Sequence, residues 1–212
     1  VMGGLPASET KYSVNEFKKM LGAYKDMNNT DIKQNLREFI EEIMPVAEEN
    51  NVKMGIHPDD PPIPLFGVPR IVSTLEDYKY ILDSYNSSCN GMTFCAGSLA
   101  SNFNNDVYKI FSKFKKRVNF IHLRNIKKEK DRKSFYESNH LKGDIDFVRL
   151  IKMILKEEKR RSKIKKIEIP MRPDHGHSLL DDQSKKNFNP GYTAIGRLMG
   201  LSELRGIIKA VI

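Results

Sequence analysis

Short apolar segments alternate with longer segments of helical periodicity along this chain of 212 residues. A strand, a helix and a second strand in the same sheet predict parallel pairing, because the helix returns the chain to the same edge of the sheet. The sequence therefore predicts an α/β fold built around a parallel sheet. The predicted strands are residues 52–57, 91–95, 118–123 and 166–170.

The predicted helices are marked by apolar residues three or four positions apart and by capping residues at their starts. Ser13 with Glu16, and Ser73 with Glu76, form the capping-box pattern. Residues 124–143 are polar and lack clear periodicity, and such a long loop in a compact domain is more often functional than idle. The predicted helices are residues 13–27, 31–50, 73–85, 106–116, 146–160, 192–200 and 202–212.

Four strand–helix units are half of the eight in a (β/α)8 barrel, whose usual size is ~250 residues. A bare half-barrel would leave two long sheet edges open, which favours aggregation. The chain also begins at Val1 without an initiator methionine. We therefore expect residues 1–212 to form one domain, the C-terminal part of a TIM-like (β/α)8 barrel whose N-terminal part is missing from this sequence.

Composition excludes several classes of protein. Hydrophobic residues make up 39% and charged residues 30% of the chain, as in globular rather than disordered proteins. No apolar run approaches the ~20 residues of a membrane span, so we expect no membrane association. Two cysteines, Cys89 and Cys95, are too few for a disulfide framework, and the expected location is the cytoplasm.

The formal net charge of +9 raises the question of nucleic-acid binding. Lysine and arginine cluster at residues 113–117, 127–133 and 159–166. Apart from Phe114 these runs lack interleaved aromatic residues, and acidic residues dilute the sequence around them. We therefore expect solvated helix faces and loops rather than a nucleic-acid partner, with a mildly positive field that attracts a small anionic substrate.

Potential metal ligands stand at or just beyond the ends of the predicted strands. In a barrel the carboxyl ends of the strands converge on one face, where the loops hold the chemistry. An imidazole pair, a thiolate and a carboxylate on that face predict a divalent metal site, and these ligand types suit Zn, Fe or Mn. A closed structural zinc site is less expected, because the ligands come from distant strands. The four residues are His57, Cys95, His122 and Asp174.

Residues beside these ligands suit acid–base chemistry and anion binding. Asp174 precedes His175 and His177, and a metal-binding carboxylate beside an imidazole with a free nitrogen is a plausible base–metal pair. Strand alternation places His122 and Arg124 on one face, where the guanidinium would meet a carboxylate in a bidentate contact. The leading hypothesis is therefore a metal-dependent enzyme.

Nine blocks of the sequence resemble the mannonate dehydratase family. They follow one another in order over almost the whole chain, and several are long and unusual in composition. The blocks are HPDDPP at 57–62, FGVPRI at 66–71, NGMTFCAGS at 90–98, FIHLRN at 120–125, HLKGDID at 140–146, IPMRPDHGH at 169–177, LDD at 180–182, NPGY at 189–192 and GRLMGLSELRG at 196–206.

The resemblance implies a TIM-like barrel that binds Mn²⁺ or Fe²⁺. It also implies removal of water from D-mannonate to give 2-dehydro-3-deoxy-D-gluconate, a step of hexuronate degradation. By analogy the metal falls on the four ligands above, with Asp174 also serving catalysis, His175 matches the base with His177 as the other candidate, and Tyr192 matches the acid. The candidates for binding the substrate are Arg124, Arg172 and His140.

Two alternatives stay open from the sequence. Another divalent-metal barrel enzyme, such as a sugar isomerase or a hydrolase, would more often use carboxylates and histidines without a thiolate, so Cys95 favours the dehydratase. A basic nucleic-acid-binding module would bind DNA or RNA with steep salt dependence and without a metal. We also expect a homo-oligomer.

Overall fold

A computed structural model of the chain describes residues 12–164, 168–184 and 191–212. Its main sheet has four parallel strands in the order β1-β2-β3-β6, so the predicted α/β class with a parallel sheet is confirmed. Because the neighbouring strands run in the same direction, their carboxyl ends meet at one edge. The strands are β1 (Met54–Ile56), β2 (Asn90–Cys95), β3 (Val118–His122) and β6 (Met171–Arg172).

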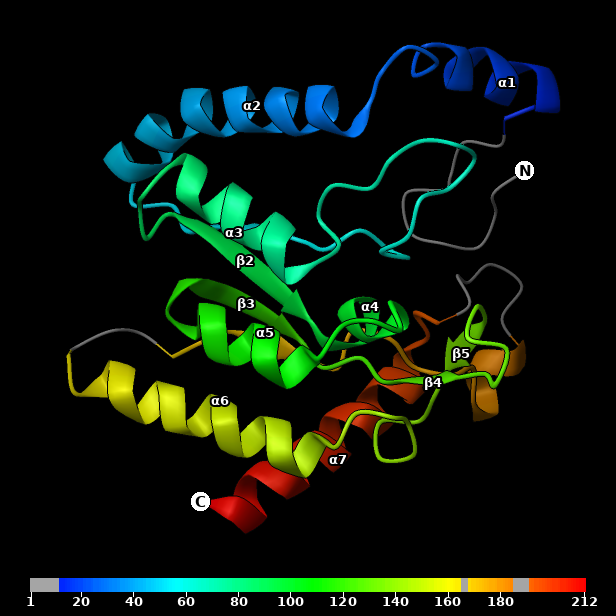
Figure 1. Cartoon of the computed structure of the whole chain (residues 1–212). Helices are drawn as coiled ribbons and strands as arrows, with labels where there is room; N and C mark the ends of the chain where they lie inside the picture. The colour runs from blue at the N-terminus through cyan, green and yellow to red at the C-terminus, as the bar shows by residue number, and fades with distance from the viewer. Residues whose placement is uncertain (1–11, 165–167, 185–190) are drawn as a thin grey trace.

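Helices connect the strands and cover them. Figure 1 shows α2, α3, α5 and α6 arranged in chain order around the strands, from the top of the view to the bottom. Within the described ranges, every helix is too short or too polar to cross a membrane. The helices are α1 (Val14–Gly22), α2 (Asn29–Glu49), α3 (Leu75–Ser84), α4 (Ala96–Ser101), α5 (Val107–Phe114), α6 (Phe147–Ser162) and α7 (Ala194–Val211), with 3-10 turns at Lys115–Arg117 and Leu180–Ser184.

The core lies between the strands and the apolar faces of these helices. All six residues of β2 are buried, as expected for a parallel strand covered on both faces. Phe94 of β2 packs edge-to-face on Phe111 of α5, with ring centroids 5.2 Å apart. The fully buried Tyr78 of α3 donates a hydrogen bond of 3.1 Å to the carbonyl oxygen of Ile56, which ties α3 to the end of β1.

Of the two predicted capping boxes, the first is confirmed and the second is wrong by one residue. Ser13 caps α1, and its side chain accepts from the backbone N–H of Glu16. The cap of α3 is Thr74, whose side chain accepts from the N–H of Asp77. The hydroxyl of Ser73 instead donates to Asp59, and this contact ties the helix start to the loop after β1.

Residues 124–143 were predicted to lack regular structure, and this prediction is wrong. They contain an antiparallel hairpin of β4 (Ile126–Lys128) and β5 (Phe135–Glu137). Each strand has three residues, which is too short for alternation of apolar and polar side chains to stand out in the sequence. The hairpin therefore depends on its tertiary setting, and it places Glu137 close to the carboxyl edge of the main sheet.

The last predicted strand and the last two predicted helices also differ from the structure. Residues 166 and 167 lie outside the described residues, residues 168–170 are not in a strand, and pairing begins at Met171. Pro170 and Pro173 have no N–H to donate, which confines β6 to the two residues between them. The two predicted helices form the single helix α7, which continues through Gly200 without a break.

Candidate metal centre and neighbouring cavity

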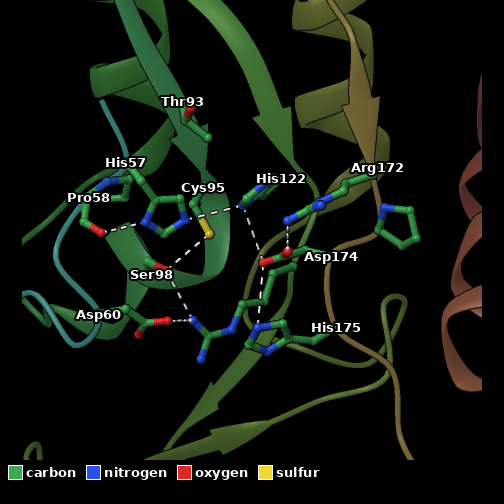
Figure 2. A network of polar contacts seen from close by, with 12 residues as sticks. His57, Pro58, Asp60, Thr93, Cys95, Ser98, His122, Arg172, Asp174 and His175 are labelled. Carbon is green, nitrogen blue, oxygen red and sulfur yellow. Dashed lines mark hydrogen bonds and ion pairs between the residues drawn. The ribbon is translucent and has the colours of Figure 1, made fainter. Parts of the chain in front are cut away.

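The carboxyl ends of three strands bring three potential ligands together. His57 follows β1, and Cys95 and His122 are the last residues of β2 and β3, where they are register partners. One potential ligand atom from each of these residues lies within 4.8 Å of the other two. Figure 2 shows the three side chains pointing toward one another. The strand ends thus place two imidazoles and a thiol around one point.

A backbone carbonyl orients His57. Nδ1 of the ring lies 2.6 Å from the carbonyl oxygen of Pro58, and since this oxygen only accepts, Nδ1 carries the proton and donates. Nε2 therefore presents its lone pair inward, 3.2 Å from Nδ1 of His122. A carbonyl behind the far nitrogen is a common support for metal-binding histidines, because it fixes the tautomer of the ring.

Asp174 is the fourth predicted ligand, and it reaches the same place. Its Oδ2 lies 3.3 Å from Nδ1 of His122. Its Oδ1 accepts a hydrogen bond of 2.9 Å from Nη2 of Arg172, so Arg172 holds the carboxylate with Oδ2 turned toward His122. Asp174 has a φ of 71°, in the left-handed region that residues other than glycine seldom adopt. Such strained residues cluster at functional sites, where their surroundings hold them.

Burial keeps both His122 and Cys95 uncharged. It lowers the pKa of His122 to about 4, although Asp174 opposes the shift, so the imidazole is neutral at neutral pH, the form in which a ring nitrogen can coordinate a metal. Burial raises the pKa of Cys95 to about 12, although the charge of Arg124 opposes the shift. Cys95 is therefore a thiol, 3.0 Å from the hydroxyl of Ser98, and a coordinated metal would replace its proton.

These residues fit a bound cation. Imidazole nitrogens, a sulfur and a carboxylate oxygen converge from four strand ends, and all of them act as ligands through lone pairs. Zn, Fe and Mn accept such a mixed set. Three of the four predicted ligands thus have ligand atoms within 4.8 Å of one another, and the fourth, Asp174, contacts His122.

An imidazole–phenol pair stands next to this cluster. Nε2 of His175 lies 2.7 Å from the hydroxyl of Tyr192 and 3.5 Å from Oδ2 of Asp174. A backbone bridge between Gly176 and Tyr192 holds the two segments side by side. Burial is the main cause that raises the pKa of Tyr192 to about 12, so its hydroxyl keeps its proton at neutral pH. The pair offers a proton acceptor and a proton donor within reach of one ligand.

Arg124 is buried and already paired. Its Nη1 donates to Asp60 at 2.5 Å and to the hydroxyl of Ser98 at 3.0 Å, and its Nε donates to Glu137 at 2.7 Å. Burial alone would lower the pKa of Arg124, but the two carboxylates raise it, so the guanidinium is a permanent cation. In this arrangement Arg124 first organises Asp60 and Glu137, and a substrate carboxylate would have to share it with them.

A cavity of about 830 Å³ opens beside the cluster. This volume lies within the ~300–1,000 Å³ range of small-molecule sites. His57 of the ligand cluster, the imidazole–phenol pair and Arg124 with its two carboxylates thus line one space. Its polar lining comprises His57, Asp60, Arg124, Glu137, His175, His177, Ser178 and Tyr192.

Arg172 and His140, two of the predicted substrate-binding residues, lie elsewhere. Arg172 contacts Asp174 and lines a second hollow, next to α7. His140 is 4% exposed, and its Nε2 lies 3.2 Å from the carbonyl oxygen of Pro173. Both residues therefore support the loop that carries Asp174, and their binding of substrate stays a prediction.

Three residues of the site were missed in the sequence. Asp60, Ser98 and Glu137 all contact Arg124. Asp60 stands in the HPDDPP block next to a predicted ligand, so its position was a usable signal. Glu137 offered no signal, because the hairpin that carries it was not recognised.

The amino-acid sequence matches a family model over its whole length. The model describes D-mannonate dehydratase (UxuA), and the match covers residues 1–212. The mannonate dehydratase of Chromohalobacter salexigens is 44% identical over 211 residues, which are 100% of this chain and 54% of that protein. The mannonate dehydratase of Saccharophagus degradans is 43% identical over 213 residues, 100% of this chain and 53% of that protein. The chain thus spans about half the length of the curated relatives it matches.

The fold is similar to a solved structure. The crystal structure of mannonate dehydratase from Streptococcus suis serotype 2 superposes with a TM-score of 0.83 at 34% sequence identity. The superposition covers 96% of this chain and 56% of the other. Sequence and fold therefore agree on the same group of relatives.

Proposed function

The chain belongs to the D-mannonate dehydratase family, and from this premise we propose that it carries the metal-binding and proton-transfer groups of such an enzyme. The reaction removes water from D-mannonate and gives 2-dehydro-3-deoxy-D-gluconate. A proton leaves C2, beside the carboxylate, the hydroxyl leaves C3 as water, and the resulting enol rearranges to the 2-keto acid. The observation that carries the proposal is the convergence of His57, Cys95 and His122, with Asp174 against His122, beside the His175–Tyr192 pair.

We propose that the four parallel strands belong to a TIM-like (β/α)8 barrel and that the chain supplies roughly the C-terminal half of it. The order β1-β2-β3-β6, with helices between the strands, supports this proposal because barrels consist of such units. The coverage of 53–54% of each curated relative is consistent with it. Residues 1–212 would then form a single domain together with further barrel strands.

His57, Cys95, His122 and Asp174 would hold the metal, Mn²⁺ or Fe²⁺. When bound, the cation supplies positive charge that stabilises the negative charge developing on the substrate carboxylate. Arg172 turns Oδ2 of Asp174 toward the ligand cluster, and Pro58 fixes the ring of His57. These contacts would hold the side chains of Asp174 and His57 in place for the cation before substrate arrives.

His175 would be the base that takes the proton from C2, and Tyr192 the acid that protonates the leaving hydroxyl. The contacts of the two rings support His175 over His177. Nε2 of His175 faces both Tyr192 and Asp174, whereas Nε2 of His177 lies 3.2 Å from the backbone oxygen of Glu137. Burial keeps Tyr192 protonated, as an acid requires, and Asp174 links the pair to the metal site.

Arg124 would hold the anionic end of the substrate electrostatically, from its place in the cavity wall. Mannonate is a small anion, and the buried guanidinium is the permanent cation of this wall. We also propose a cytoplasmic location and a role in hexuronate degradation. The two cysteines are free thiols, which suits a reducing compartment. The comparisons name dehydratases rather than isomerases or hydrolases, and a homo-oligomer stays a prediction.

The test is incubation of the protein with D-mannonate and Mn²⁺, followed by detection of the 2-keto-3-deoxy acid. We expect product with metal and none with chelator. Tyr192→Phe should keep the metal and lose most of the rate, while Tyr136→Phe, on the exposed side of β5, serves as the matched control. Turnover that survives complete metal removal, or equal rates in the two variants, would refute the assignment.

A further inference from the structure

We propose that Glu137 is a positioning residue that fixes the tautomer of His175. In this arrangement Nδ1 of the imidazole carries the proton and Nε2 keeps its lone pair toward Tyr192 and the cavity. The inference rests on the proposed function only in so far as His175 acts as the base. It adds a residue on the β4–β5 hairpin to the proton-transfer machinery.

The contacts of the His175 ring divide it into two sides. Nδ1 lies 3.0 Å from Oε1 of Glu137, and Nε2 lies 2.7 Å from the hydroxyl of Tyr192. The N–H direction at Nδ1 does not point straight at Oε1, so the contact is close without being a well-aligned hydrogen bond. Nδ1 is nevertheless fully buried, and a buried ring nitrogen needs a partner. Glu137 is the carboxylate that faces it among the described residues.

Glu137 is ionised and can therefore only accept hydrogen bonds. Burial would raise the pKa of Glu137, but its contacts with His175 and Arg124 outweigh burial and lower it. An ionised carboxylate only accepts hydrogen bonds, so the nitrogen that faces it must be N–H. In a neutral imidazole the other nitrogen then carries the lone pair. Nε2 is thereby left able to accept a proton.

Arg124 fixes the position of Glu137 in turn. Its Nε donates to the same oxygen, Oε1, that faces Nδ1 of His175, and its Nη1 is held by Asp60 and Ser98. Glu137 therefore has little freedom to turn away from the ring. Oε1 of Glu137 faces both Arg124 and His175. A glutamine at this position keeps one such oxygen and therefore tests whether an acceptor is enough.

The carboxylate of Asp174 favours the opposite tautomer of His175. Oδ2 of Asp174 lies 3.5 Å from Nε2 of His175 and by itself favours a proton on Nε2. A ring with its proton on Nε2 has no lone pair there and is a poor base at that position. Glu137 opposes this state from the other side of the ring. Without Glu137, the balance shifts toward the unproductive tautomer.

Three variants separate positioning from mere support of the fold. Glu137→Ala removes the acceptor, and we expect kcat to fall about 100-fold with KM changed less than threefold, because contacts that orient an imidazole are worth about 10–100-fold. Glu137→Gln keeps one oxygen for Arg124 and His175 and should restore most of kcat. Glu129→Ala removes an exposed carboxylate from the same hairpin and is the control for hairpin charge.

The direct test is nitrogen-15 NMR of the histidine rings, in the Zn²⁺-loaded protein and again without metal. The chain has five histidines, so a His175→Gln spectrum assigns the ring. We expect the Nδ1–H tautomer in the original protein and in Glu137→Gln, and the Nε2–H tautomer in Glu137→Ala. An Nε2–H ring in the original protein, or an unchanged tautomer in Glu137→Ala, would overturn the proposal. The spectra require no turnover, so a protein inactive on D-mannonate would contradict the proposed function while leaving this result intact.

Discussion

The two ends of the parallel sheet both bury polar side chains, but they do so in opposite ways. At the amino end, where strands begin, Arg117, Asn119 and Arg161 donate to backbone carbonyl oxygens. At the carboxyl end, lone-pair atoms of His57, His122 and their neighbours face one another. Matching of donors to acceptors, rather than burial alone, therefore separates a structural polar cluster from a candidate functional one.

The amino end is closed by its own hydrogen bonds. Nη2 of Arg117 lies 2.5 Å from the carbonyl oxygen of Asn90, and the amide of Asn119 lies 2.6 Å from that of Met54. Nη2 of Arg161 reaches the carbonyl oxygens of Lys115 and Val118 at 2.6 and 2.9 Å. These donors satisfy backbone oxygens where the strands start.

The carboxyl end gathers groups of the kind that hold a cation. Two imidazole nitrogens and one sulfur lie close together there, with a carboxylate oxygen of Asp174 against His122. Two of the arginines in the basic runs of the sequence, Arg117 and Arg161, act at the amino end as internal donors. Their presence in basic runs is therefore no evidence for nucleic-acid binding.

The largest expected effect is at the carboxyl end. Asp174→Ala and Cys95→Ala should each weaken Mn²⁺ binding about 1,000-fold, because the free energy of a transition-metal site is shared among a few ligands. Isothermal titration calorimetry on the metal-free protein measures it, with far-UV circular dichroism as the check on folding. Unchanged Mn²⁺ affinity in both variants would contradict the proposal that the carboxyl end of the sheet, unlike the amino end, binds a metal.

The next effect is at the amino end. Arg161→Ala should lower the free energy of unfolding by about 3 kcal/mol, since Glu157 is left buried with only Arg160 as its partner. Metal affinity should not change. Urea denaturation measures the loss, and Lys163→Ala, an exposed cation next to the end of α6, is the control. A loss of metal affinity equal to that of the ligand variants would show that the two ends are not separate.

A glycine pair in α7 tests how the fold supports the site. A Cβ at Gly200 would lie 2.2 Å from the ring of His140, which holds the carbonyl of Pro173, whereas a Cβ at Gly206 would meet nothing within 4 Å. Gly200→Ala should therefore cost about 2 kcal/mol and also weaken metal binding. Gly206→Ala should stabilise the helix by up to ~1 kcal/mol. Thermal denaturation with and without Mn²⁺ distinguishes the outcomes, and equal effects of the two variants would contradict the packing.

The smallest effect is a pH dependence at the amino end. The hydrogen bond from Arg160 is the main cause that lowers the pKa of Glu157 below its ordinary value. A lowered pKa stabilises the fold above the unfolded-state pKa, and this stabilisation disappears as pH falls through the folded-state pKa. Glu157→Gln should cost about 1.5 kcal/mol at pH 7 and progressively less below pH ~4.5. Urea denaturation at several pH values checks it; a cost that grows as pH falls would reverse the sign.

Local patterns predicted most of the fold. Strand–helix alternation predicted the parallel sheet. The positions at strand ends predicted which side chains meet at one edge, because strand direction alone places them there. The hairpin, the one-residue shift of the α3 cap and the continuity of α7 depend on partners distant in sequence. Gly200 is an example, since the ring of His140 that requires it lies 60 positions earlier. The roles of Glu137 and Ser98 follow from their contacts with Arg124, which only the three-dimensional structure shows.

The most direct test of the account is titration of the metal-free protein with Co²⁺, followed by visible and near-ultraviolet absorption. One Co²⁺ per chain should bind and give a thiolate-to-cobalt charge-transfer band. This band should vanish in Cys95→Ser, and the ligand-field bands should change in His57→Ala, His122→Ala and Asp174→Ala. Saturable binding of one ion without the band, or a spectrum indifferent to all four substitutions, would contradict the claim that these side chains share one cation.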